Sequence, residues 1–336
     1  VKGVNYPFLI ACVYFASGSW VTGLSSSIPL LLGTEKNYLI EAGILSEIIP
    51  TSFTLGSLLN ISMMAFYVIF APIMILLLIP KSKNIQQLDD MLEDKTEKNE
   101  LSIKEEALSL NLSFKTVSDR LNNGTVLQIC IVLMGLTYII YHFYTNGFQL
   151  NFNIMIFLFL IIGMLLHKTP MRYVIAMKRS SNNISGILYQ YPFYAGIMGI
   201  MIYTGLGEKL AEVMSSIATI ETYPFFAYLT GAIANFAIPS AGGEFAVVGP
   251  SIINAVKEIG TGFPANEVTA MISRASLSVA YGESLSNLLQ PFYLLLVFPI
   301  MGSGIKIQAR DVMGYLVIPF IVFFIIQSIL VTWMPL

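Results

Sequence analysis

Two polar segments, far apart in the chain, place carboxylates and amides inside apolar sequence. The first, NFAIPSAGGEFAVVGP at residues 235–250, carries Glu244 beside a Pro-Ser-Ala-Gly-Gly stretch. The second, GESLSNLLQP at residues 282–291, places Glu283, Asn287 and Gln290 at spacings that share one helical face. Ionisable groups at membrane depth are costly and are typical of ligand, ion or proton sites. These segments are therefore the first candidates for function.

The chemistry of the first segment follows from its proline and glycines. Pro239 interrupts helical hydrogen bonding, and Gly242 and Gly243 permit a positive φ. The pattern predicts a helix, an unwound polar tip and a returning helix within 223–256. The backbone N–H groups that begin the returning helix would attract a carboxylate. A kink without a ligand is the plain alternative, and Glu244 could instead hold a cation or cap its helix.

The second segment has a counterpart near the start of the chain. GSWVTGLSSSIPL at residues 18–30 runs in the same order: Gly, a stretch rich in hydroxyls or amides, Pro and apolar residues. Unwinding is expected near 18–28 and 281–286, with both breaks approaching the tip of the hairpin. Paired interrupted helices are typical of secondary transporters built from inverted repeats.

The two ionisable residues of the second broken span have several possible roles. Glu283 could hold a cation, carry a proton or pair with Arg274. Arg274 could extend outward to the membrane surface or balance a bound carboxylate.

Composition decides the class of protein that must position these segments. The chain is 55% hydrophobic and 11% charged, with a mean hydropathy of +0.73, whereas soluble domains are about 25% charged. Residues 80–123 alone hold 7 basic and 9 acidic residues. These features exclude a soluble enzyme, a disordered chain and a nucleic-acid binder, and they predict an all-α polytopic membrane protein. The expected spans are 6–32, 53–79, 125–145, 152–167, 184–206, 267–300 and 313–333, with an interrupted stretch at 223–256.

Charge and repeat arguments suggest how the spans are organised. Basic residues favour the cytoplasmic side, which places 168–183 and the loop 80–123 inside. The parity of the spans then requires that 223–256 be a re-entrant hairpin or two short spans. An inverted partner for this hairpin should precede residue 6, so we expect the first part of the first repeat to be missing. The expected domains are 1–79 (remainder of the first repeat), 80–123 (cytoplasmic charged linker) and 124–336 (second repeat with the hairpin 223–256).

At these residues the sequence resembles the short-chain fatty acid transporter family, the bacterial acetoacetate and butyrate permeases of the ion transporter superfamily. The resemblance covers nearly the whole chain and is strongest at 235–250, at YGESLSNLLQPFY (281–293) and at ARDVMGY (309–315). It implies a carrier of small monocarboxylates in the cytoplasmic membrane, coupled to Na⁺ or H⁺. This chain departs from the family pattern at Ala241, Glu244, Phe245 and Leu285, which leaves chain-length preference and the coupling ion open.

The expected site combines the two breaks with the tip of the hairpin. The carboxylate should meet backbone N–H groups and hydroxyls, and Asn235 and Glu283 should hold the coupling Na⁺ or accept the coupling H⁺. The expected substrate-binding residues are Ser25, Ser26, Ser27, Ser240, Gly242, Gly243, Glu244, Ser284, Asn287 and Gln290. The expected hinge or unwound positions are Gly18, Pro29, Pro239, Gly249, Pro250, Gly282 and Pro291.

Other functions compete with this one. A cation/proton antiporter of the same superfamily would use Glu244 or Glu283. An intramembrane enzyme would need a base near Ser240, but His142 and His167 lie at the ends of spans, so we expect no catalytic residue. We also expect no metal centre, no cofactor and no nucleic-acid partner; the expected partners are a monocarboxylate, membrane lipid and a second copy in a homodimer.

Overall fold

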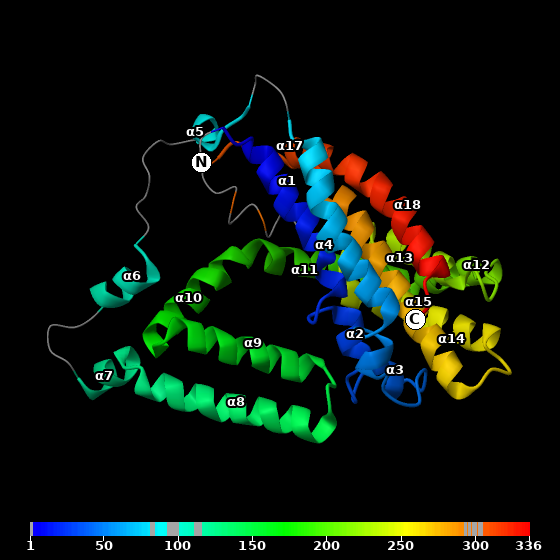
Figure 1. Ribbon diagram of the computed structural model, residues 1–336, viewed down its shortest axis with the longest axis horizontal. Helices are drawn as coiled ribbons and strands as arrows, with labels where there is room; N and C mark the ends of the chain where they lie inside the picture. The colour runs from blue at the N-terminus through cyan, green and yellow to red at the C-terminus, as the bar shows by residue number, and fades with distance from the viewer. Residues whose placement is uncertain are drawn as a thin grey trace. The chain divides into compact units, whose positions relative to one another are not determined.

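The computed structural model describes residues 3–80, 85–92, 101–110, 116–291, 294, 297, 301 and 305–336. In these ranges the regular elements are helices, and the β-type pairing is limited to one bridge between Leu92 and Ile305 (Figure 1). Four helical stretches of the described residues are long and apolar enough to cross a bilayer: Tyr6–Leu32, Leu58–Leu78, Val126–Asn146 and Ala309–Trp333. The prediction of an all-α polytopic membrane protein is confirmed.

The chain divides into two compact units. Unit 1 comprises Val1–Glu93 and Tyr189–Leu336, unit 2 comprises Asp94–Leu188, and α11 (Ser185–Tyr203) crosses the boundary. Both candidate segments lie in unit 1. This division by packing differs from the expected repeats and linker, which stay a prediction.

Unit 2 is a set of helices around an apolar pair. In that pair, α8 (Val126–Asn146) and α9 (Phe152–His167) are joined by a hydrogen bond from Gln128 Nε2 to the Met164 carbonyl, 2.6 Å long. Both lie within a residue or two of the spans expected from the sequence. The other helices of the unit are α6 (Ile103–Ser109), α7 (Val117–Asn123) and α10 (Pro170–Asn183).

The charged loop contributes α6 and α7, which both pack against α10. Glu106 of α6 forms an ion pair with Arg179 of α10. Each loop helix begins with a capping box. Hydrogen bonds from Ser102 hold the pKa of Glu105 below its usual value, and hydrogen bonds from Thr116 do the same for the pKa of Asp119. The described part of the loop is therefore partly helical.

Unit 1 is arranged around α15 (Ala265–Ser286), in which every residue from Ile272 to Ser286 except Arg274 is buried. The elements packed directly against it include α13, α14, α18, α2 and η1. A helix buried all round needs close neighbours on every side. The other elements of the unit are α1 (Tyr6–Ser17), η1 (Gly18–Thr22), α2 (Ser27–Leu32), α3 (Tyr38–Glu41), η2 (Thr51–Phe53), α4 (Leu58–Leu78), α5 (Leu88–Met91), α12 (Leu206–Ser216), α13 (Tyr223–Ala234), α14 (Ala241–Ile259), η3 (Asn287–Leu289), α17 (Ala309–Met313), η5 (Gly314–Leu316) and α18 (Val317–Trp333).

Two glycines set the separation between α13 and α15. A Cβ atom on Gly282 would lie 2.0 Å from the Tyr228 carbonyl oxygen and 2.8 Å from the Ala232 nitrogen. A Cβ atom on Gly231 would lie 2.4 Å from the Val279 carbonyl oxygen. The obstructing atoms are backbone, which cannot rotate away. Small residues therefore allow the two helices to touch along their backbones, as in other membrane helix pairs.

The interrupted stretch 223–256 forms two helices, α13 and α14, joined by residues 235–240. At 1.5 Å per residue, α13 is about 18 Å long and α14 about 28 Å, so only α13 is clearly shorter than a bilayer of about 30 Å. That the pair enters and leaves on one side stays a prediction.

Four residues of α14 that we expected to be unwound or to have a positive φ are helical instead. Gly249 and Pro250 lie inside the continuous helix, because buried side chains on both sides of them, such as Val248 and Ile252, hold the helix in place. Gly242 and Gly243 form the first turn of α14, and neither has a positive φ.

The second break is displaced from its expected position. Helix α15 continues through 281–286, so Gly282 lies in regular helix, and the interruption begins at η3 and Gln290. The helix continues because Gly282 provides the contact with α13 and the next proline is Pro291. By contrast, the first break lies where expected, since α1 ends at Ser17 and α2 begins at Ser27.

Candidate functional site

A tyrosine from the first span is hydrogen-bonded to the backbone at the second break. Pro291 has no N–H, so it cannot donate to the carbonyl of Asn287 four residues earlier. Tyr14 of α1 donates its hydroxyl to that carbonyl at 2.8 Å, and it also contacts the carbonyl of Gln290. The Asn287 carbonyl also accepts from the Gln290 nitrogen at 3.1 Å. The backbone group freed by the proline is thus satisfied by a 3-10 turn and by a side chain from another helix, as a membrane interior requires.

The same break is tied to the turn of the hairpin. The side-chain amide of Gln290 donates to the carbonyls of Asn235 and Phe236, at 2.9 and 3.2 Å. In return, Asn235 Nδ2 donates to Ser286 Oγ at 2.8 Å and to Asn287 Oδ1 at 3.0 Å. The structure therefore brings the second break to the end of α13, at 235–236, while Ser240 and the glycines lie further along the turn.

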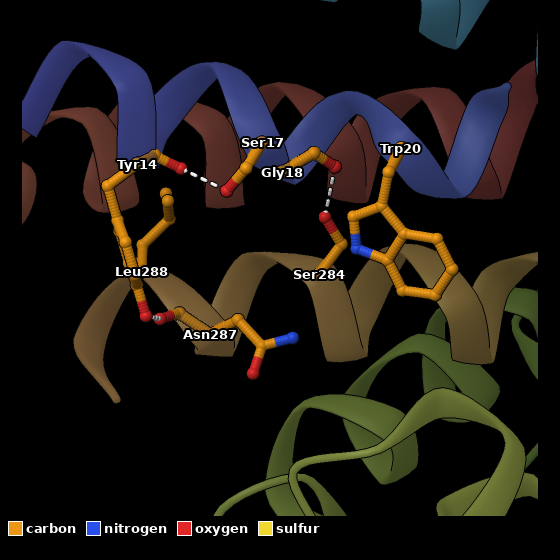
Figure 2. A pocket seen from close by; sticks show the side chains of 7 residues that line it. All are labelled: Tyr14, Ser17, Gly18, Trp20, Ser284, Asn287 and Leu288. Carbon is orange, nitrogen blue, oxygen red and sulfur yellow. Dashed lines mark hydrogen bonds between the residues drawn. The ribbon is translucent and has the colours of Figure 1, made fainter. Parts of the chain in front are cut away.

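The first break contacts α15 through Gly18. Ser284 Oγ donates to the Gly18 carbonyl (Figure 2). A small pocket lies at this contact, lined by Tyr14, Ser17, Gly18, Trp20, Ser284, Asn287 and Leu288. The pocket is too narrow for a water molecule, so a carboxylate could enter only after the two breaks move apart.

Glu283 is fully buried one turn before the second break. Its Oε1 accepts a hydrogen bond of 2.7 Å from Asn287 Nδ2, and its Oε2 has no hydrogen-bond partner. Asn235 is equally buried, and its Oδ1 also has no partner. The two residues expected to bind the coupling ion are therefore neighbours, since Asn235 Nδ2 lies 3.2 Å from the carbonyl oxygen of Glu283.

Glu244 is also fully buried, and neither of its carboxylate oxygens has a hydrogen-bond partner. It therefore does not cap α14. Its helix, α14, packs against α15, the helix that carries Glu283. Burying a carboxylate without a partner is expensive, so this side chain requires a ligand, an ion or a proton.

The tip of the hairpin is accessible to solvent. Ser240 precedes α14 as its N-cap, and its side chain makes no capping hydrogen bond. Ser240 and Gly242 are exposed, and nothing lies within 4 Å of the place a Gly242 Cβ would take. The first backbone hydrogen bond at this end joins the Glu244 nitrogen to the Ser240 carbonyl. The N–H groups before it are available to an anion.

The three serines of the first break have different environments. Ser25 is exposed, Ser26 is buried with an unpaired Oγ, and Ser27 is half-buried as the first residue of α2. Pro29 lies in the first turn of α2 and is not itself unwound. Helix α2 packs against α14 and α15, but no hydrogen bond of these serines connects them to the Gly18–Ser284 contact.

Arg274 does not pair with Glu283. It lies nine residues earlier on the same helix, which is about 13 Å along the axis. Its guanidinium donates instead to the carbonyls of Val331 and Thr332, at 3.0 and 2.8 Å. These carbonyls end α18, where a positive charge also balances the helix dipole. Arg274 is thus a cap for α18.

Sequence reasoning missed a chain of buried polar side chains beside Ser284. Gln327 of α18 donates to the Tyr67 hydroxyl at 2.9 Å and accepts from the Tyr228 hydroxyl at 3.1 Å. The Tyr67 hydroxyl lies 3.4 Å from Ser284 Oγ. A second bond joins the Tyr281 hydroxyl to Asn60 Oδ1 at 2.9 Å. The available signal was a lone amide in an apolar span, which is costly in lipid unless it has a partner.

Metal-ligating side chains do not gather in the part of the chain that the structure describes: no three His, Cys, Asp or Glu residues lie close enough to share an ion. The polar atoms that do lie close together are mostly side-chain and backbone oxygens. The site offers carboxylate and amide acceptors near the breaks and backbone donors at the tip.

The comparisons with known proteins agree with this architecture. Residues 1–334 match the family described as "Short chain fatty acid transporter". The chain is 33% identical over 315 residues to a "Putative short-chain fatty acid transporter" of Escherichia coli K12, covering 94% of this chain and 66% of that protein. It is 32% identical over 320 residues to a protein of the same name from Haemophilus influenzae Rd, covering 94% of this chain and 67% of that one. The chain thus spans about two thirds of the length of these relatives. No solved structure matches it. The match along residues 1–334 and the identity to both relatives show that this chain belongs to the short-chain fatty acid transporter family.

Proposed function

We propose that this protein carries short-chain monocarboxylates such as acetoacetate and butyrate across the cytoplasmic membrane by secondary active transport, coupled to Na⁺ or H⁺. The observation that carries the proposal is the open first turn of α14, in a chain of this family. A helix N-terminus attracts carboxylates because its free N–H groups and its dipole point at the ligand.

The donors at the tip suit a small, singly charged substrate. Ser240 has a hydroxyl that makes no capping bond, and Gly242 leaves the backbone uncovered. A monocarboxylate needs fewer positive partners than a dicarboxylate, and the residues of the tip, 238–243, include no Lys or Arg. The substrate carboxylate therefore binds backbone N–H groups, and its short apolar tail fills the remaining space.

Two other expected substrate residues, Ser284 and Gln290, form hydrogen bonds within the protein in this conformation. Ser284 donates to Gly18, and the Gln290 amide is committed to the carbonyls of 235 and 236. These contacts close the breaks against each other. In the proposed cycle they open so that Ser284 and Asn287, with the serines of the first break, can reach the substrate.

A sharp test is uptake of labelled butyrate and acetoacetate into proteoliposomes by Gly242→Val. The added Cβ meets nothing within 4 Å, so the fold should tolerate the side chain, yet the side chain covers the N–H groups that the carboxylate needs. We expect uptake to be lost. Gly314→Val is the matched control, because Gly314 also has right-handed helical backbone and open space around its Cβ position. Normal uptake by Gly242→Val would remove the hairpin from substrate binding.

Ser240→Ala tests the contribution of the hydroxyl. One neutral hydrogen bond contributes about 0.5–1.5 kcal/mol, so apparent affinity should weaken by up to about tenfold while transport continues. An unchanged affinity would assign binding to the backbone alone.

A cation/proton antiporter is the second candidate, because buried Glu244 and Glu283 lack cationic partners among the described residues. The two functions differ in one assay. The carrier accumulates labelled butyrate along an imposed Na⁺ or H⁺ gradient, whereas the antiporter moves protons against Na⁺ in vesicles that contain no carboxylate.

A further inference from the structure

Several oxygen atoms of the hairpin and of the chain around the second break are buried and have no hydrogen-bond donor. They are both carboxylate oxygens of Glu244, Oε2 of Glu283, Oδ1 of Asn235 and Oε1 of Gln290. Glu244, Glu283 and Asn235 are all fully buried. A buried acceptor without a partner is uncommon in native structures and needs an explanation.

Most of the nearby amide N–H groups already have other partners. Asn287 Nδ2 is engaged by Glu283 Oε1, and Asn235 Nδ2 is engaged by Ser286 and Asn287. Gln290 Nε2 is engaged by the carbonyls of the hairpin turn. The amide oxygens of Asn235 and Gln290 are thus free, whereas that of Asn287 accepts from Asn235. Free amide oxygens beside carboxylates are the arrangement that a cation needs.

The charges of the cluster also call for a cation. Glu244 lies on α14 and Glu283 on α15, which pack against each other, and no described ion pair includes either of them. Part of the negative charge of Glu244 is offset by its position in the first turn of α14, where the helix dipole is positive. The pair is therefore left with a negative charge that a bound cation would balance.

The oxygen ligands narrow the choice of ion. Carboxylate and amide oxygens bind hard cations, and Ca²⁺ or Mg²⁺ sites usually add further carboxylates or several waters. Two carboxylates and one amide, enclosed among buried side chains, suit a small monovalent ion that can be released in each transport cycle.

We propose that Glu244 and Glu283, together with Asn235 Oδ1, form a binding site for one Na⁺ ion at the junction of α13, α14 and α15. This inference rests on the proposed cation coupling, and it moves Glu244 from the substrate to the ion. The hairpin then carries both ligands: the ion at Glu244, and the substrate carboxylate at the N–H groups immediately before it.

The test measures ion binding directly and without substrate. The purified protein is melted in detergent in NaCl, KCl or choline chloride at constant ionic strength, and binding of radioactive Na⁺ is measured in parallel. The melting temperature of the wild type should rise with Na⁺ concentration and not with K⁺ or choline, because a ligand that binds only the folded state stabilises it. Glu283→Gln and Glu244→Gln keep the side-chain shape and should each weaken apparent Na⁺ affinity at least tenfold. Glu267→Gln is the matched control: it makes the same change on an exposed residue of α15 and should behave as wild type.

The outcomes are distinct. Wild-type Na⁺ binding in both Gln variants overturns the site, as does stabilisation by Ca²⁺ at concentrations where Na⁺ has no effect, or a melting temperature that follows pH alone. Butyrate uptake without Na⁺ binding overturns this inference and leaves the proposed function standing. Na⁺ binding lost in the Gln variants, with no carboxylate uptake by wild type, supports the ion site and overturns the proposed function.

Discussion

The contact between α13 and α15 allows a strict prediction, because the substitution Gly282→Ala adds a single methyl group against backbone. The Cβ atom would lie 2.0 Å from the Tyr228 carbonyl oxygen and 2.8 Å from the Ala232 nitrogen, and real Cβ contacts are essentially never shorter than 3.0 Å. Neither helix can relieve the clash by a side-chain rotation. The helices must therefore separate, or α15 must rotate.

The size of the effect follows from two terms. Overpacking a tight interface costs about 1–3 kcal/mol. Separation also strains the hydrogen bonds of Asn235 to Ser286 and Asn287, each worth about 0.5–1.5 kcal/mol. We expect Gly282→Ala to be destabilised by about 2–4 kcal/mol and to lose uptake, because Asn235 and Glu283 no longer lie side by side.

The assay is thermal unfolding in detergent together with butyrate uptake, with Gly314→Ala as the control because its Cβ meets nothing within 4 Å. Gly231→Ala acts on the same interface, at 2.4 Å from the Val279 carbonyl oxygen. Once the helices have separated, the second methyl has less to clash with, so the double variant should lose less stability than the sum of the single variants. A Gly282→Ala protein as stable and active as Gly314→Ala, or fully additive losses, would refute the close contact.

Three other perturbations test separate features. Gln327→Leu leaves the buried hydroxyls of Tyr67 and Tyr228 without their shared partner and should cost about 1–3 kcal/mol in thermal unfolding; an unchanged melting temperature would contradict the polar chain. Arg274→Leu removes the cap of α18 and should loosen its last turn, seen as faster hydrogen exchange at 330–333, and exchange at the wild-type rate would assign Arg274 to the membrane surface. The pKa of Asp119 is lowered, so its capping of α7 is complete above the usual pKa of 3.8 and is lost as the pH falls below that value. A spin label on α7 should therefore become more mobile at low pH. Equal mobility at low and neutral pH, or the same transition in Asp119→Asn, would contradict the cap.

Local chemistry alone was enough to locate the hairpin turn and the first break. A helix is disfavoured at Pro239, and also at Gly18 and the serines that follow it, whatever surrounds these residues. The structure interrupts the helices at both places. The membrane class was equally plain, since a chain with so few charges outside 80–123 cannot cover a soluble surface. The motifs at 235–250 and 282–291 also indicated the family that the comparisons show.

What only the tertiary structure decided is which polar groups meet and where helices continue. The sequence around Gly282 predicts a break, but Gly282 is helical because its backbone packs directly against the backbone of α13. The second interruption lies at Gln290, before Pro291, and Tyr14, from the far end of the chain, adds a hydrogen bond to the Asn287 carbonyl there. The role of Gln327 is evident only from its hydrogen bonds with Tyr67 and Tyr228. Such contacts join residues that are far apart in the chain, and their energy depends on geometry that no local pattern contains. The sequence can show that a buried polar group needs a partner, but only packing selects the partner.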